Sequence, residues 1–141
     1  MININKELSD AMRSGILEIY RNMVINDDVD QVSYVNNKIF QKVAMLQNSE
    51  IEMERYLSAY AKIMFELFNY ETREQPLQEY HKYMISALYY FCDPYDYFPD
   101  MHHDDAHLDD ALVVNQCLEI LKEQSRDTYK HISNYIRDSN I

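Results

Sequence analysis

Apolar residues recur at steps of three and four along most of the chain. This spacing places them on one side of an α-helix, which has about 3.6 residues per turn. It predicts helices at about residues 6–25, 29–47, 50–69 and 77–92, and a fifth from about residue 104 to residue 136. A break near Ser125-Arg126-Asp127 would divide the fifth helix into two. The pattern therefore predicts an all-α fold of five or six helices.

Local signals indicate where several of these helices begin and end. Ser49 and Glu52 have the spacing of a capping box, in which each side chain bonds the other residue's backbone N–H. Residues 70–76 are polar and predict a loop, with Pro76 at the first position of the fourth helix. Pro94 ends that helix, because the residue before a proline avoids the helical region. One Gly and three Pro in 141 residues are few for a β-rich domain, and the length fits a single compact domain over residues 1–141.

The predicted connection between the last two long helices is rich in aspartate and proline. Seven aspartates lie in residues 93–110, and no Lys or Arg lies between Lys82 and Lys122. Two prolines restrict the backbone, and the aromatic side chains beside them favour packing over a flexible link. We therefore predict an ordered corner that joins these helices. Its structural residues are predicted to be Asp96, Pro99, Asp100, Asp109 and Asp110.

These residues resemble a known family. A helix that ends in Pro-x-Asp-apolar-apolar-Pro-Asp, followed after a short connection by Asp-Asp, is similar to the signature of the YkvA-like family of small helical proteins. The matching positions are Pro94, Asp96, Pro99, Asp100, Asp109 and Asp110. The resemblance covers residues 77–121, and in place of the family's apolar connection this chain has a segment rich in His and Asp. The family has no settled activity, so the resemblance implies only a helical fold with a structured acidic corner.

Charge narrows the classes of partner. The formal net charge is −11, and such a surface opposes binding to nucleic acid and favours a basic protein. No apolar run approaches the roughly 18 residues of a membrane span, so we predict no membrane insertion. The N-terminus lacks a signal-peptide core, and Cys92 and Cys117 form no C-x-x-C pair, which is typical of a cytoplasmic protein. The sequence makes no prediction about oligomeric state.

Carboxylates and imidazoles in the corner allow a divalent metal as an alternative. His103 and His107 lie one helical turn apart, and Asp104 and Asp109 supply oxygen ligands if the last helix begins by His103. Neither a calcium loop nor an H-E-x-x-H motif is present, and this weighs against the metal. We therefore predict no cofactor, with a divalent metal as the alternative. A phosphohydrolase of the His-Asp type is a weaker alternative. It would use the pair His103-Asp104 with His81 and Asp127.

Composition favours a binding function over catalysis. Thirteen tyrosines supply contact area and hydroxyl groups, and charge of one sign steers an oppositely charged partner. We therefore predict a non-enzymatic acidic protein-binding module. It would be an inhibitor, immunity protein or adaptor for a basic partner such as a nuclease or toxin. The predicted contact residues are Tyr95, Tyr97, Asp104 and Asp105. The alternative is a metal-binding protein or metal-dependent hydrolase that uses the Asp/His-rich corner.

Overall fold

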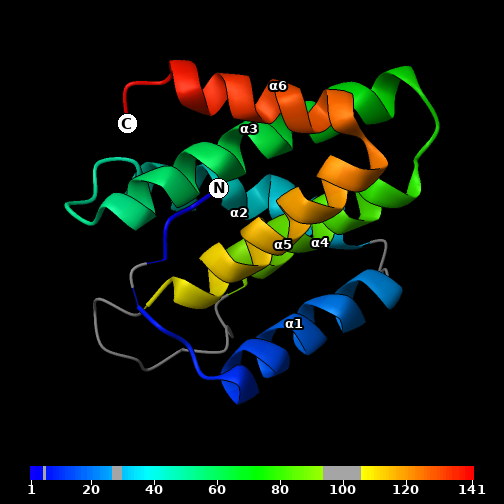
Figure 1. The fold of residues 1–141 in the computed structure, drawn as a ribbon. Coiled ribbons are helices and arrows are strands. Elements are labelled where there is room, and N and C mark those ends of the chain that lie inside the picture. Colours follow the sequence, from blue (N-terminus) through cyan, green and yellow to red (C-terminus); the bar gives the residue numbers. More distant parts are fainter. Residues whose placement is uncertain (5, 27–29, 94–105) are drawn as a thin grey trace.

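The computed structural model describes residues 1–4, 6–26, 30–93 and 106–141 (Figure 1). Within these ranges the chain forms six α-helices and no strand, which confirms the predicted all-α fold. The helices are α1 (Asp10–Ile25), α2 (Asp30–Leu46), α3 (Glu52–Glu74), α4 (Glu79–Cys92), α5 (Leu108–Gln124) and α6 (Arg126–Asp138). None of these described helices combines the length and the apolar character needed to cross a membrane.

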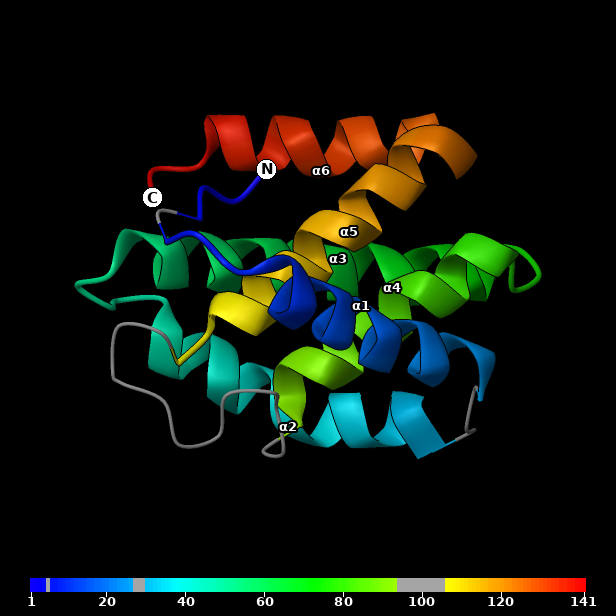
Figure 2. The same ribbon diagram turned by 60° about the horizontal axis from the view of Figure 1, so that its bottom comes forward.

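Helix α4 forms the centre of the fold. It packs against α1, α2, α3 and α5, and most of its side chains are buried as a result. Helix α6 lies across α3 and α5, on the opposite side of the molecule from α2 (Figure 2). The buried apolar side chains of all six helices join in one hydrophobic core. The polar groups discussed below lie where the ends of helices meet at the edge of this core.

Two predicted helix boundaries around residues 70–79 are wrong. Helix α3 continues through Tyr70 to Glu74, where a loop was predicted, and α4 begins at Glu79 instead of Pro76. The polar residues of this stretch remain helical because Glu71 faces inward and bonds side chains of two other helices. The polar residue Glu71 therefore belongs to a helix and makes contacts inside the fold, and it does not indicate a loop.

The predicted capping box at the start of α3 is also wrong. The residue that caps this helix is Ile51, which places Glu54, and not Glu52, at the third helical position. The Ser49 hydroxyl accepts from the Ile51 N–H at 3.0 Å and donates to Glu54 Oε1 at 2.6 Å. Ser49 thus pairs with an acidic residue five positions later in the chain.

Other boundaries agree more closely with the sequence pattern. Helix α4 ends at Cys92, and Asp93 is extended with φ −71° and ψ 125°, as expected of the residue before Pro94. The predicted break near Ser125 is confirmed, since Ser125 with φ −147° separates α5 from α6. The predicted start of α5 near residue 104 is wrong, because residues 106 and 107 form a turn and the helix begins at Leu108.

Candidate functional site

Two buried carboxylates hold the beginning of α5 against its neighbours. Asp109 and Asp110 lie in the first turn of the helix and are 0% and 1% exposed. The Tyr90 hydroxyl of α4 donates to Asp109 Oδ2 at 2.8 Å. This contact ties the start of α5 to the end of α4, on either side of the aspartate-rich connection.

Asp110 binds a cation from a distant part of the chain. Its Oδ2 lies 3.5 Å from the Lys42 ammonium of α2 and 3.0 Å from His107 Nδ1. The same ammonium donates to the backbone carbonyl of Phe91 and lies 4.7 Å from the centre of the Phe91 ring. Lys42 therefore joins α2 to the last turn of α4 and the first turn of α5.

This geometry changes the interpretation of the aspartate-rich stretch. No cation adjoins it in the sequence, but the fold brings Lys42 to Asp110 from α2. Because Asp109 and Asp110 are buried and bonded within the protein, they are not available as exposed charges for a partner. Of the seven aspartates in residues 93–110, at least these two therefore do not contribute to an acidic surface.

Two of the four predicted metal ligands, His107 and Asp109, lie in the described residues and contact other side chains. Asp109 bonds Tyr90, whereas His107 contacts Asp110 through Nδ1 and lies 3.9 Å from Glu54 Oε2 through Nε2. In the ranges that the structure describes, no three His, Cys, Asp or Glu side chains are grouped to hold a metal ion. The other two proposed ligands, His103 and Asp104, lie outside the described residues.

The remaining corner and contact residues also lie outside the described part of the chain, so their roles stay predictions. They are Tyr95, Asp96, Tyr97, Pro99, Asp100 and Asp105.

A second candidate site is a pocket of about 740 Å³ between α3, the beginning of α4 and the beginning of α6. Acidic, aromatic and hydroxyl side chains line it together. Those that matter for its chemistry are Glu66, Tyr70, Glu71, Tyr80, Asp127 and Thr128. The sequence pattern does not reveal this pocket, because the residues that form it come from separate helices.

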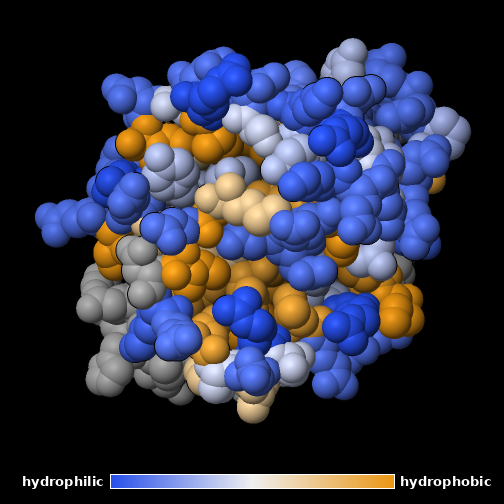
Figure 3. All heavy atoms as spheres, viewed as in Figure 1, coloured by the Kyte–Doolittle hydropathy of each residue, from blue (hydrophilic) through white to orange (hydrophobic). Residues whose placement is uncertain are grey.

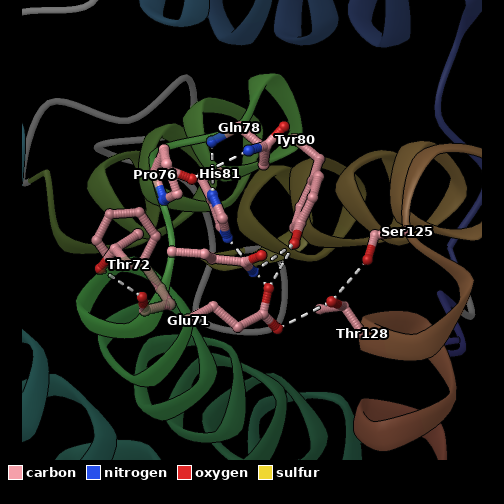
Figure 4. Close-up of polar contacts among 10 residues, drawn as sticks. Glu71, Thr72, Pro76, Gln78, Tyr80, His81, Ser125 and Thr128 are labelled. Atoms are coloured by element: carbon pink, nitrogen blue, oxygen red, sulfur yellow. Dashed lines mark hydrogen bonds and ion pairs between the residues drawn. The ribbon is translucent and has the colours of Figure 1, made fainter.

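Glu71 lines the pocket, and its carboxylate accepts from three hydrogen-bond donors (Figure 4). Glu71 Oε1 accepts from the Tyr80 hydroxyl at 2.6 Å and from His81 Nε2 at 3.1 Å. Glu71 Oε2 accepts from the Thr128 hydroxyl at 2.9 Å. Burial and the bond to Glu71 both raise the pKa of Tyr80, so its hydroxyl remains a donor. One carboxylate thus connects α3, α4 and α6.

The hydrogen bonds of His81 determine what this network can do. His81 is fully buried, and its Nδ1 accepts from the Gln78 N–H at 2.8 Å. In the neutral ring the proton therefore lies on Nε2, which donates to Glu71. No lone pair of the imidazole remains to accept a proton from a substrate. The His-Glu pair consequently positions helices. His103 and Asp104, which the phosphohydrolase alternative also requires, lie outside the described residues.

The two thiols are expected to resist modification. Burial raises the pKa of both Cys92 and Cys117 to about 12, above the roughly 8.5 of a free thiol. The folded protein keeps these thiols protonated to a higher pH than the unfolded chain does. Their contribution to the free energy of unfolding is therefore fully present below about pH 8.5 and is lost as the pH rises toward 12. With an aromatic disulfide reagent at pH 8, we expect no reaction beyond the rate of unfolding, and two reactive thiols in urea. A fast reaction of the folded protein would contradict the burial of these groups.

Comparisons with protein families, characterised proteins and solved structures gave no match to this chain. The resemblance to the YkvA-like family therefore stays a prediction from residues 77–121.

Proposed function

We propose that this protein is a non-enzymatic binding module for a basic protein and acts as an inhibitor, immunity protein or adaptor. The observation that carries the proposal is the uneven distribution of charge along the chain. Residues 27–30 and 94–105, which connect or border helices, contain seven of the 24 acidic residues and none of the 13 Lys and Arg. Most of the net charge of −11 therefore comes from two short segments, and a basic partner matches such concentrated charge.

The contacts beside the longer segment support this proposal. Binding residues often lie on connections that a rigid scaffold holds at both ends. Here Tyr90 and Phe91 precede the segment and Asp109 and Asp110 follow it, and these residues are buried and joined directly or through Lys42. The scaffold thus fixes where the acidic connection leaves and rejoins the helices.

The chemistry of the described residues also favours binding over catalysis. The two thiols are buried and have raised pKa values, and both nitrogens of His81 are committed to hydrogen bonds within the fold. These groups support the structure and offer no evident nucleophile or base. The proposal accordingly rests on charge and surface and requires no reaction.

Capture of the partner and measurement of its association rate test this function. The tagged protein is cross-linked in native cells, and the partner is identified by mass spectrometry and purified. We expect a basic protein whose association rate falls with rising salt, because the field of exposed charge extends only about 8 Å at physiological ionic strength. Asp104→Asn with Asp105→Asn should slow association about threefold to tenfold at low salt.

The matched control is Glu7→Gln with Glu18→Gln, which removes the same charge from exposed positions before and within α1. It should change the rate less, and both variants should keep the melting temperature within about two degrees, as surface substitutions usually do. An acidic partner, a salt-independent rate, or tight binding of nucleic acid would contradict the proposal. A stoichiometric transition metal in the purified protein would favour the metal-binding alternative.

A further inference from the structure

The pocket between α3, α4 and α6 has an acidic rim. Glu66 of α3 and Asp127 of α6 are exposed, and both line the pocket. Among the residues that the structure describes, neither carboxylate forms an ion pair. Hydrophilic side chains cover the surface over α6 (Figure 3), yet the Lys and Arg residues of that helix do not line the pocket. His131 of α6 also lines the pocket, so its rim carries two carboxylates beside one imidazole and no Lys or Arg.

The base of the pocket adds a third carboxylate whose position is fixed. Glu71 is held by donors from α4 and α6, and its side chain is 13% exposed. Its Oε2 accepts one hydrogen bond from Thr128, which leaves acceptor capacity on that oxygen. Because the side chain is already ordered, a ligand that donates to it would lose little entropy in positioning it.

An exposed aromatic ring completes the rim. Tyr70 is 57% exposed and follows Glu66 by one helical turn on α3, so both side chains lie at the edge of the same pocket. The face of a tyrosine ring attracts a cation, and a guanidinium group stacks on it in addition. Carboxylates around an aromatic ring are suited to a planar cation that donates several hydrogen bonds.

We propose that this pocket binds an arginine side chain of a protein partner. The guanidinium would stack on Tyr70 and donate to Glu66 and Asp127, with Glu71 as the deeper acceptor. This inference rests on the proposed function, since it names a surface that the basic partner would contact. It places that surface on α3 and α6, beside the beginning of α4 and not beside its end.

The proposal can be tested with a defined probe before any partner is known. The probe is the blocked tetrapeptide Ala-Arg-Arg-Ala, and its control replaces both arginines with citrulline, which has nearly the same shape without the charge. In an NMR titration of the full chain, the arginine peptide should shift the amide resonances of Glu66, Tyr70 and Asp127. It should bind at least about tenfold more tightly than the citrulline peptide, a difference of about 1.4 kcal/mol.

Variants of the rim locate the binding. Glu66→Gln with Asp127→Asn should weaken the arginine peptide about tenfold, whereas the charge-matched control Glu7→Gln with Glu18→Gln should weaken it less than about twofold. Circular dichroism of each variant checks that the fold is retained. Equal affinity for the two peptides, shifts confined to other helices, or equal effects of the two variants would overturn the proposal. Spermine binding in the pocket more tightly than the peptide would assign it to a free polyamine and overturn it as well.

The captured partner separates this inference from the function on which it rests. If the partner is basic and associates in a salt-dependent way, but binds the Glu66/Asp127 variant as it binds the control, then only the inference fails. If the partner is not basic, the proposed function fails, whatever the peptide shows.

Discussion

Replacing Lys42 with methionine is expected to lower the free energy of unfolding by about 3 kcal/mol, at the low end of what removing one member of a buried ion pair costs. The Lys42 side chain is 15% exposed and its partner Asp110 is fully buried, so little solvent reaches the carboxylate when the ammonium is removed. The same substitution removes a donor to the Phe91 carbonyl and a cation from the Phe91 ring. Methionine retains most of the apolar length, so the loss reports the charge and its hydrogen bond.

Urea denaturation followed by circular dichroism measures this effect. The matched control is Lys38→Met, one helical turn earlier on α2 and exposed, which should change the stability by less than about 0.5 kcal/mol. Combining Lys42→Met with Asp110→Asn should cost less than the sum of the two single substitutions, because the double variant no longer buries an unbalanced charge. Equal effects of Lys42→Met and Lys38→Met would contradict the role assigned to the ion pair.

This pair illustrates what the sequence pattern predicts and what it leaves open. Periodicity identifies the inward faces of most helices, because burying an apolar face dominates their stability. It does not state which inward polar group meets which, since Lys42 and Asp110 come together only when α2 and α5 pack around α4. The sequence nevertheless contains a local sign of burial, because the apolar residues Ala111 and Leu112 directly follow Asp109 and Asp110. All four residues are buried in the structure.

The second candidate site was missed for a related reason. Residues 70–76 are polar and predict a loop, although α3 continues to Glu74. Glu71 follows the buried Leu67 and Phe68 by four and three residues, which is the spacing of one helical face. That spacing would have placed Glu71 inward and raised the question of its donors. The identity of Thr128 as one donor depends on how α6 packs on α3, which helix periodicity does not determine.

Replacing His81 with leucine is expected to lower the free energy of unfolding by about 1–3 kcal/mol, because two partly buried hydrogen bonds are lost at once. The Gln78 N–H loses its acceptor at the beginning of α4, and Glu71 loses one of its three donors. Leucine has about the same volume as histidine but is apolar, so this fully buried position stays filled while its hydrogen bonds are lost. The expected loss therefore measures the polar network that connects α3, α4 and α6.

Two measurements distinguish this network from ordinary packing. Urea denaturation should show the loss for His81→Leu, whereas His131→Leu at an exposed position of α6 should change the stability by less than about 0.5 kcal/mol. Amide hydrogen exchange should become faster at Gln78 in the His81 variant, because its N–H no longer bonds the imidazole. A loss of stability with unchanged exchange at Gln78 would indicate that the imidazole contributes through packing alone.

If the network acts as described, Thr128→Val should weaken the contact between α6 and α3, since it removes the hydroxyl with which α6 donates to Glu71.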